Sequence, residues 1–425
     1  MLDIKFIREN KDLVKKGCEK RQLNIDIDEI LGLDQKYREN LKAIENMLAQ
    51  KNIASEKIAH AKDDHERKKM ILEMQELDDH LEKDGNKLKV TLKEYEENIR
   101  KMVSSIPNIP LEDVPIGVND KDNVVVKEVG KKTVFNFQPK NHLEIGEYLN
   151  LIDVEKAAKI SGSRFNYLKN TAVLIEFALV DLVLRALIKK GFIPVVPPVM
   201  VKENIAAGTG FLEATEKKEA YIIPEDNLYL TGTSEQSLVA MHSNEIINER
   251  DLPLRYVGFS TCFRREAGSY GKDIKGIFRA HQFDKLEMVI FSKPENSVKE
   301  HQLLLSIEEE LVQLLKLPYR VVRICTGDMG RPAASQYDIE TWLPSENRYR
   351  ETHSTSNCTD FQAVGLNIKY RGKDNKSHFV HTLNGTAFAI GRILIAILEN
   401  YQQKDGSVKV PAVLQKYTKL KIIKR

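Results

Sequence analysis

The chain has 425 residues, 42% of them hydrophobic, so it is long enough for two or more domains and too long for a small binding module. Its 65 lysine and arginine residues nearly balance its 62 aspartate and glutamate residues. The net charge of +3 excludes nucleic-acid binding by a strong overall positive field, so any contact with RNA must come from local basic patches.

The cysteine pattern and the apolar regions indicate where the protein works. The four cysteines are far apart and form no CxxC pair, which argues against a structural zinc site and a disulfide framework. The amino terminus lacks the continuous apolar stretch of a secretory signal. The most apolar region, 172–188, contains Glu176, Asp181 and Arg185, which a membrane-spanning helix would rarely tolerate. We therefore expect a soluble cytoplasmic protein with no membrane segment.

Residues 1–105 form the first predicted domain. They contain no proline, and 22 basic residues stand against 23 acidic ones. Apolar residues recur at steps of three, four and seven from Ile30 to Leu48 and again from Met70 to Met102, which is heptad spacing. Between the two stripes, the polar segment 62–66 allows the chain to reverse into an antiparallel hairpin of helices about 50 Å long. Such a hairpin suits an arm; a coiled-coil dimerisation element is the alternative.

Prolines at 107 and 110 end the hairpin and open a linker, 106–135. The remaining residues, 136–425, form the second predicted domain. Strand and helix patterns alternate in it without the regular repeat of a parallel fold, which predicts an α+β class. The predicted elements are a helix at 173–188, a strand at 192–201 that is broken by prolines, strands at 256–264 and 283–291, and a closing helix at 388–401.

Two arginine-containing stretches in this domain suit a nucleotide, although the sequence has neither the G-x4-GK-[ST] nor the G-x-G-x-x-G motif. The first, FRRE at 263–266, precedes FRAHQF at 278–283, so guanidinium groups and an aromatic ring stand at the ends of two strands. The second, NGTAFAIGR at 384–392, places an arginine at the start of an apolar helix, where small residues admit a polyphosphate; close packing of the helix is the alternative reason for the small residues.

Together with the proline-containing segment 191–198, these stretches resemble, in order, the three signature motifs of class II aminoacyl-tRNA synthetases. Class I is excluded, because no H-x-G-H occurs and KMVSS at 101–105 ends the coiled-coil stripe. Further stretches narrow the resemblance to the bacterial type of seryl-tRNA synthetase and extend it over essentially the whole chain: SGSRF at 161–165, TGTSE at 231–235, HQFDKLEM at 281–288, THSTSNCTDFQ at 352–362 and HTLNGTAFAIGR at 381–392. The resemblance implies a class II antiparallel-sheet catalytic domain with an N-terminal antiparallel coiled-coil arm.

The resemblance also implies an ATP site. In it Arg264 and Arg392, the two expected catalytic residues, hold the α- and γ-phosphates, Glu266 recognises adenine and Phe283 stacks on the base. The expected ATP site is completed by Arg265, Glu351, Thr352, His353 and Ser354. Of these, Glu351 and Ser354 are expected to bind Mg²⁺, which prefers oxygen ligands and substrate phosphates.

The implied serine pocket consists of Thr233, Ser234, Glu235, Arg279, Glu287, Asn384 and Thr386. Arg279 would face the substrate carboxylate and Glu287 the hydroxyl group. An anchored acceptor such as Glu287 is left unpaired by alanine, which discriminates strongly, whereas threonine has to be excluded sterically. His281 and His353 are expected to have structural or supporting roles, since no oriented partner for a general base is visible in the sequence.

The expected reaction is attack of the serine carboxylate on the α-phosphate of ATP, followed by transfer of serine to the 3′ end of tRNA(Ser), and of tRNA(Sec) where it is present. Positioning and charge neutralisation carry such a reaction without a protein nucleophile. The expected partners are tRNA(Ser), bound by the arm, and a second copy of the chain in a homodimer, because motif 1 lies at the subunit interface in class II enzymes.

One stretch departs from the family pattern. The family usually continues DFQARR, but this chain has Val364 and Gly365 in place of the two arginines. We interpret the change as the loss or relocation of a contact to tRNA or between subunits. A catalytically silent RNA-binding paralogue would need a broken site, yet the key arginines and carboxylates are present. Truncated relatives that load amino acids onto carrier proteins lack the helical arm.

Overall fold

The computed structural model describes residues 1–212, 219–267 and 276–425. Within them the chain forms two compact units. The smaller unit contains residues 2–19 and 23–106, and the larger contains 107–425 together with Met1 and 20–22.

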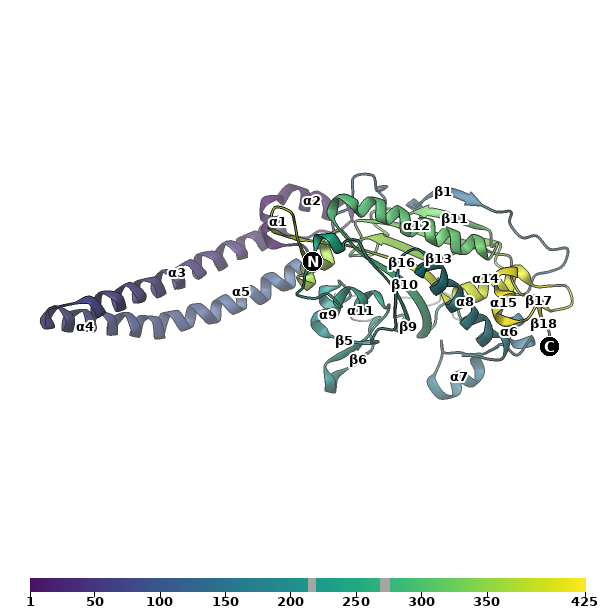
Figure 1. Cartoon of the computed structure of the whole chain (residues 1–425), viewed down its shortest axis with the longest axis horizontal. Coiled ribbons are helices and arrows are strands. Elements are labelled where there is room, and N and C mark those ends of the chain that lie inside the picture. Colours follow the sequence, from purple (N-terminus) through teal and green to yellow (C-terminus); the bar gives the residue numbers. More distant parts are fainter. Residues whose placement is uncertain (213–218, 268–275) are drawn as a thin grey trace. The chain divides into compact units, whose positions relative to one another are not determined.

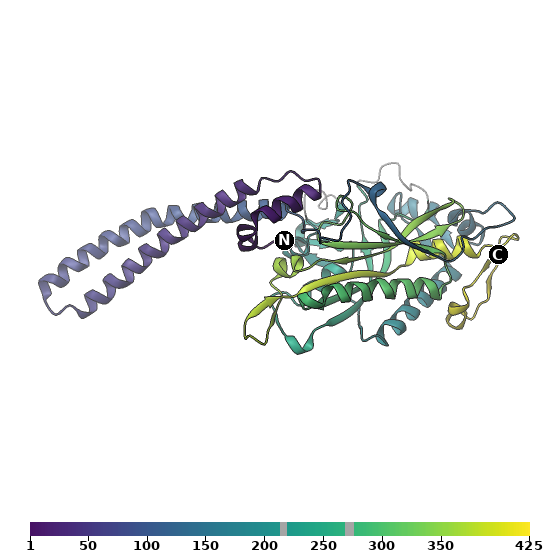
Figure 2. The same ribbon diagram turned by 90° about the horizontal axis from the view of Figure 1, so that it is seen from above.

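The smaller unit is entirely helical (Figure 1). Its elements are α1 (Ile4–Glu9), α2 (Lys11–Lys20), α3 (Ile27–His60), α4 (Asp64–His80), a π-helical turn (Leu81–Gly85) and α5 (Asn86–Ser105). α3 runs beside α4 and α5 in both views (Figures 1 and 2), as the predicted hairpin requires. The reversal is confirmed and is tighter than predicted: it occupies 61–63, and Asp63 Oδ1 accepts the backbone N–H groups of His65 and Glu66 at 2.8 and 3.0 Å to start α4.

An eight-stranded sheet forms the centre of the larger unit, in the order β1–β11–β12–β13–β16–β10–β9–β4. All neighbours are antiparallel except β4, which is parallel to β9, so the predicted antiparallel α+β class is confirmed. The strands are β1 (Val124–Val129), β4 (Ile193–Val195), β9 (Leu254–Phe263), β10 (Gln282–Ser292), β11 (Tyr319–Arg323), β12 (Ser335–Leu343), β13 (Arg348–Asn357) and β16 (His381–Ala389).

Three long helices pack with this sheet around one hydrophobic core: α8 (Thr171–Ile188), α12 (Ser297–Leu314) and α14 (Ile390–Tyr401). α12 lies along β13 and β16 in both views (Figures 1 and 2). The predicted helix at 173–188 is confirmed as α8. No helix among the described residues is long and apolar enough to cross a membrane.

Shorter elements surround the sheet. The helices are α6 (His142–Tyr148), α7 (Val154–Ser161), α9 (Glu203–Gly208), α11 (Glu235–Ala240), α13 (Phe361–Leu366) and α15 (Ala412–Thr418). The strands form small separate sheets: β5 (Met200–Lys202), β6 (Ile222–Ile223) and β7 (Leu228–Leu230); β8 (Ile246–Asn248), β14 (Lys369–Arg371) and β15 (Ser377–Phe379); β2 (Ile152–Asp153) and β3 (Tyr167–Leu168); β17 (Val408–Lys409) and β18 (Ile422–Ile423).

Three sequence expectations differ from the structure. The closing helix begins at Ile390, because Phe388 and Ala389 still pair with Leu286 and Lys285 in the sheet. The strand expected at 192–201, broken by prolines, is two separate strands in different sheets, since the prolines between them cannot donate ladder hydrogen bonds. The expected linker 106–135 contributes β1 to the sheet, paired with β11.

β10 shows how the sheet separates core from site. Leu286, Met288 and Ile290 are completely buried in the core, whereas Lys285 and Glu287, the alternate residues, line a cavity on the other face. On β16, likewise, Asn384 and Thr386 line this cavity while their alternate neighbours lie in the core. The antiparallel sheet therefore collects polar side chains from distant parts of the sequence on one surface.

Candidate active site

One cavity of about 360 Å³ is lined by residues of β10, β12, β13 and β16 and of the segments beside them. The predicted site residues that line it are Thr233, Glu235, Arg264, Glu266, Arg279, Phe283, Glu287, Glu351, Thr352, His353, Ser354, Asn384, Thr386 and Arg392. They come from segments that are separated by up to 159 residues in the sequence, 233 to 392, so the fold brings the predicted nucleotide and serine positions together.

Arg264, immediately after β9, is held on two sides. Its Nε donates to the Gly232 carbonyl at 3.1 Å, and its guanidinium carbon lies 5.4 Å from the centre of the Phe283 ring. Since β9 and β10 are antiparallel neighbours, the start of β10 places Phe283 beside the end of β9. The pair combines a phosphate-binding fork with an aromatic face on which a base can stack.

Glu266 and Arg279 form a second pair across the same two strands. Arg279 Nη1 lies 3.3 Å from Glu266 Oε2. Glu266 has φ of +50°, an uncommon conformation for a non-glycine residue, and Arg164 donates to its carbonyl at 3.1 Å. The backbone is thus bent so that the Glu266 side chain faces the cavity.

Arg392, in the first turn of α14, pairs with Glu351 of β13. Its Nη1 lies 2.8 Å from Glu351 Oε1, and its guanidinium carbon lies 4.9 Å from the centre of the Phe278 ring. Arg350 stacks on the same ring at 3.8 Å. Desolvation acts to raise the pKa of Glu351, but the charges of Arg392, Arg264 and Arg279 outweigh it, so the pKa lies below the ordinary value. Glu351 is therefore ionised at neutral pH.

Ser354, on the same strand as Glu351, belongs to a polar group at one side of the cavity. Gln336 Nε2 donates to Ser354 Oγ and to Asp338 Oδ1, both at 3.1 Å. Burial and the Glu351 carboxylate raise the pKa of Asp338 to about 8, so Asp338 is largely neutral at pH 7. No cluster of three or more His, Cys, Asp or Glu residues suited to a metal occurs in the described part of the chain.

Glu287 forms the centre of the predicted serine pocket. It is 2% exposed, its Oε2 lies 2.5 Å from Lys285 Nζ, and Thr386 Oγ1 donates to the same oxygen at 3.2 Å. A buried carboxylate is costly unless it is paired, and here a lysine and a threonine stabilise it. The carboxylate keeps acceptor capacity for a hydroxyl group.

Glu235, at the start of α11, forms the other wall of this pocket. Its Oε1 accepts from Gln362 Nε2 at 2.7 Å and from Asn384 Nδ2 at 3.0 Å. Burial and the charge of Glu287 raise the pKa of Glu235 to about 7, against the opposing effects of Gln362, Lys285 and Arg264. Its charge therefore changes close to neutral pH.

The two predicted histidines are engaged by the protein itself. His353 packs against Phe388, its Nδ1 lies 2.9 Å from Thr352 Oγ1, and burial lowers its pKa to about 3, so it is neutral. Thr352 Oγ1 also donates to the Ile339 carbonyl at 3.2 Å. His281 Nδ1 lies 2.9 Å from the Arg264 carbonyl. Both imidazoles thus have partners within the protein, and their structural or supporting roles stay a prediction.

Two predicted site residues lie outside the cavity lining. Ser234 is buried at the start of α11, with its side chain packed against Gly258 of β9: a Cβ added to that glycine would lie 3.0 Å from Ser234 Oγ. Arg265 is exposed, and its backbone N–H donates to the Glu219 carbonyl at 2.8 Å. Each is adjacent in sequence to a residue that lines the cavity.

Sequence reasoning missed several residues of the site. Lys285 lines the cavity as the ion-pair partner of Glu287, two residues earlier on one strand, so period-two spacing could have identified it. Phe278 supports Arg392 and Arg350, and Gln362 orients Glu235. Cys358 lines the cavity beside Asn384, 3.4 Å from its amide nitrogen. Only the folded sheet identifies these last contacts.

The structure shows a close backbone contact at Gly365, one of the two positions where the family pattern has arginine. Gly365, near the end of α13, packs directly on α9: a Cβ at this position would lie 2.2 Å from the Gly208 carbonyl oxygen. Gln362 of the same helix donates to the Thr209 carbonyl at 3.1 Å. The close approach of the two backbones leaves no room for an arginine at 365.

Comparison with known proteins agrees with this geometry. Residues 219–401 match the tRNA synthetase class II core domain (G, H, P, S and T), and residues 1–110 match the seryl-tRNA synthetase N-terminal domain. The chain is 44% identical to a serine–tRNA ligase of Thermodesulfovibrio yellowstonii over 100% of both chains, and 44% identical to one of Thermococcus onnurineus over 100% of this chain and 97% of the relative. The crystal structure of seryl-tRNA synthetase from Pyrococcus horikoshii complexed with ATP superposes with a TM-score of 0.90 at 41% identity, over 100% of this chain and 99% of that one.

Proposed function

The chain belongs to the seryl-tRNA synthetase family and is a serine–tRNA ligase with ATP as substrate, and we propose that the cavity lined by β10, β12, β13 and β16 is the site of serine activation. The observation that carries this proposal is the placement of Arg264, Arg392 and Glu287 in one cavity, with each side chain fixed by a protein contact. Such preorganised charges stabilise a phosphoryl-transfer transition state without reorganisation.

ATP would bind between the two arginines. Phe283 offers its ring to the adenine and Glu266 accepts from the adenine amino group, while Arg264 holds the α-phosphate and Arg392 the γ-phosphate. The serine carboxylate attacks the α-phosphorus and pyrophosphate leaves, so one P–O bond forms and one breaks. Holding the two reactants in line and neutralising charge provides most of the rate enhancement.

The residues at the phosphate end fit Mg²⁺. Glu351 is ionised, and its side chain is 46% exposed toward the cavity. Ser354 provides a hydroxyl oxygen on the same strand. Mg²⁺ favours one or two protein oxygen ligands together with phosphates, so Glu351 and Ser354 would hold the ion, which would neutralise phosphate charge.

The serine pocket would combine charge and shape. Arg279 faces the substrate carboxylate, Glu235 the ammonium group and Glu287 the hydroxyl group, with Thr233, Asn384 and Thr386 as neighbours. Since Glu287 is 2% exposed, alanine would leave its acceptor unpaired away from water. This arrangement favours serine over alanine.

We further propose that the helical hairpin binds tRNA(Ser) and that the protein works as a cytoplasmic homodimer. Exposed apolar side chains on α8, Leu174, Phe177 and Ile188, support a subunit interface. Sedimentation of the purified protein should show a dimer, and Phe177→Glu should shift it toward monomer. None of the four cysteines is in a disulfide and all are buried, in keeping with a reducing compartment. Charging of tRNA(Sec) stays a prediction.

Serine-dependent ATP–pyrophosphate exchange tests the site assignment. Arg392→Ala and Glu351→Gln should each lower kcat/KM for ATP by about 100-fold, because each removes a charge that faces the phosphates or the metal. Arg348→Ala is the matched control: Arg348 lies on the same strand as Glu351, is exposed and pairs with the neighbouring carboxylate of Glu346. Normal exchange in both site variants would refute the assignment.

A further inference from the structure

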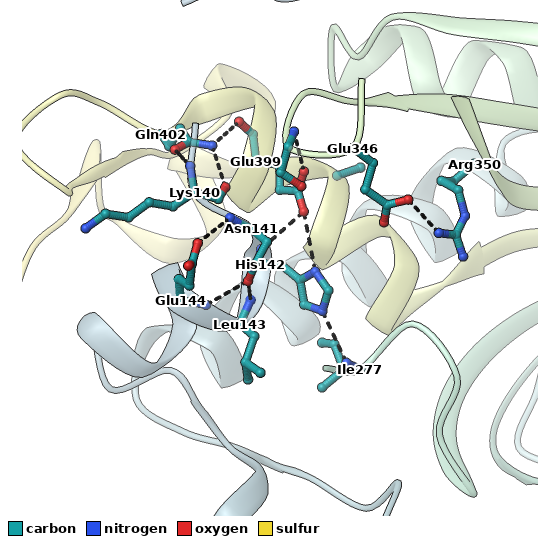
Figure 3. A network of polar contacts seen from close by, with 12 residues as sticks. Lys140, Asn141, His142, Leu143, Glu144, Ile277, Glu346, Arg350, Glu399 and Gln402 are labelled. Carbon is teal, nitrogen blue, oxygen red and sulfur yellow. Dashed lines mark hydrogen bonds and ion pairs between the residues drawn. The ribbon is translucent and has the colours of Figure 1, made fainter. Parts of the chain in front are cut away.

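His142, the first residue of α6, connects three segments of the larger unit (Figure 3). Its Nε2 accepts the backbone N–H of Ile277 at 3.3 Å. Its Nδ1 lies 3.4 Å from Glu399 Oε1, which also accepts the backbone N–H of His142 at 3.1 Å. Because a backbone N–H can only donate, Nε2 must be the unprotonated nitrogen, and Nδ1 carries the proton toward Glu399. The two partners thus select one tautomer.

The surroundings of His142 fix the ring in place. Glu399, on α14, is completely buried, and its other oxygen accepts the Ser345 backbone N–H at 3.2 Å. Lys140 lies one residue before the α6 N-cap and makes two hydrogen bonds with the Gln402 side chain (Figure 3). The Lys140 backbone N–H donates to Gln402 Oε1 at 2.9 Å, and Gln402 Nε2 donates to the Lys140 carbonyl at 3.0 Å. The start of α6 is therefore tied to the end of α14.

The chain that meets His142 is adapted to this contact. Gly276 has φ of +85°, and a Cβ added to it would lie 2.1 Å from His142 Nε2. Any side chain at 276 would displace the ring and break the hydrogen bond to Ile277. The glycine and the histidine form a matched pair.

The residues that follow Ile277 reach the cavity. The Phe278 ring lies under the guanidinium groups of Arg350 and Arg392, at 3.8 and 4.9 Å, and Arg279 pairs with Glu266 at 3.3 Å. A cation gains stabilisation only while it stays over the ring face, so a shift of the segment would misplace Arg392 and Arg279 together.

We propose that His142 is a positioning residue: with Glu399 it fixes Ile277 and thereby holds Phe278 and Arg279 in the geometry that binds ATP and serine. His142 touches neither substrate in this arrangement and acts through the backbone of 277–279. The inference rests on the roles proposed above for Arg392 and Arg279.

Two substitutions at position 142 separate positioning from mere support of the fold. The amide oxygen of His142→Gln can take the place of Nε2 and accept from Ile277, whereas the shorter side chain of His142→Asn can still reach Glu399 but not Ile277. The exchange assay should give a KM for ATP and a KM for serine that are about five- to tenfold higher in His142→Asn, since one buried hydrogen bond is lost. In His142→Gln both values should return to within about threefold of the parent.

The alternative role predicts different numbers. A purely structural histidine would lower the melting temperature and the apparent kcat, through a smaller folded fraction, and leave both KM values unchanged. Unchanged KM values in folded His142→Asn, or equal defects in the Asn and Gln variants, would overturn the proposal. If neither variant folds, Phe278→Leu decides: it removes the ring beneath Arg392, and an unaltered KM for ATP contradicts the mechanism. Arg392→Ala, measured in the same series, tests the proposed ATP site itself. Normal exchange in Arg392→Ala would refute the site, whereas a defect in Arg392→Ala with unchanged KM values in His142→Asn would refute only the role of His142.

Discussion

At the scale of single residues, the environment of Glu235 sets its chemistry. Burial and the nearby Glu287 carboxylate raise the pKa of Glu235 to about 7, while Gln362, Lys285 and Arg264 act in the opposite direction. A raised carboxyl pKa means that falling pH protonates the group early. Below about pH 7 the pocket therefore loses the charge that would face the ammonium group of serine.

We predict that the KM for serine is lowest near pH 8 and rises as the pH falls through about 7 toward 6, because binding requires the ionised form of Glu235. Exchange rates measured across this range, with ATP saturating, provide the profile. Glu235→Gln should bind serine weakly, and its KM should be nearly independent of pH. A parent profile that is flat between pH 6 and 8 would contradict this role of Glu235.

Sequence reasoning at this scale identified the residue types and missed their partners. Arg264, Glu287 and Arg392 could be located from motifs because phosphate and hydroxyl recognition needs their chemistry. Lys285 could have been identified from its period-two spacing to Glu287 on the same strand, whereas Gln362 could not be ranked above other polar residues, since its importance comes from Glu235 on another element. The same holds for His142, whose partners lie more than 130 residues away.

At the scale of elements, the two faces of β10 divide stability from chemistry. Leu286 is completely buried in the core, and Glu287, the next residue, lies in the cavity. Leu286→Ala should lower the free energy of unfolding by about 2–5 kcal/mol, measured by urea denaturation, with the KM for serine changed little. Glu287→Gln should do the reverse, with a large loss of serine activation and a small change in stability. If Leu286→Ala instead lost serine activation and Glu287→Gln instead lost stability, the assigned orientation of β10 would be refuted.

The close contact between α9 and α13 predicts how arginine at position 364 or 365 changes the stability of the protein. Gly365→Arg has to separate two backbones and should lower the free energy of unfolding by about 1–3 kcal/mol, as overpacking does. Val364→Arg adds the same side chain at a half-buried neighbouring position and should change stability by about 0.5 kcal/mol or less. Thermal unfolding of the two variants compares them directly. Equal melting temperatures would show that the glycine contact is unimportant.

Periodicity predicted the long elements well and their ends less well. Heptad spacing located the hairpin, and apolar runs located α8, β9 and β10 to within two residues. Near the carboxyl end, an apolar run continues from strand into helix, and only pairing of Phe388 with Leu286 sets the boundary at Ile390. β1 was hidden in the presumed linker, because an edge strand needs a partner that lies far along the chain.

At the scale of the whole molecule, the described residues form two compact units, and we propose that they contribute differently to the two partial reactions. Activation of serine needs only the cavity of the larger unit, whereas transfer also needs tRNA. The hairpin has nearly balanced charges, so recognition of RNA should depend on a local basic face and on shape. Arg67, Lys68 and Lys69, three consecutive exposed basic residues on α4, are candidates for such local contacts with RNA.

Replacing these three residues together by glutamate should raise the KM for tRNA(Ser) in aminoacylation by about tenfold or more and weaken its salt dependence. Serine-dependent exchange should stay at the parent level. Glu96→Gln with Glu97→Gln, exposed positions on α5, is the control and should leave the KM for tRNA near the parent value. Loss of serine-dependent exchange in the triple-glutamate variant would argue against this division of roles. So would a KM of that variant that equals the parent value, both for tRNA with its long variable arm and for tRNA without it.

The most direct measurement for the account is ATP–pyrophosphate exchange by the purified chain at saturating Mg²⁺ with single amino acids. The geometry predicts rapid exchange with serine and rates lower by orders of magnitude with alanine, which cannot satisfy the buried Glu287 carboxylate. Absence of exchange with serine, or equal exchange with alanine, would contradict the assignment of this cavity as a serine-activating site.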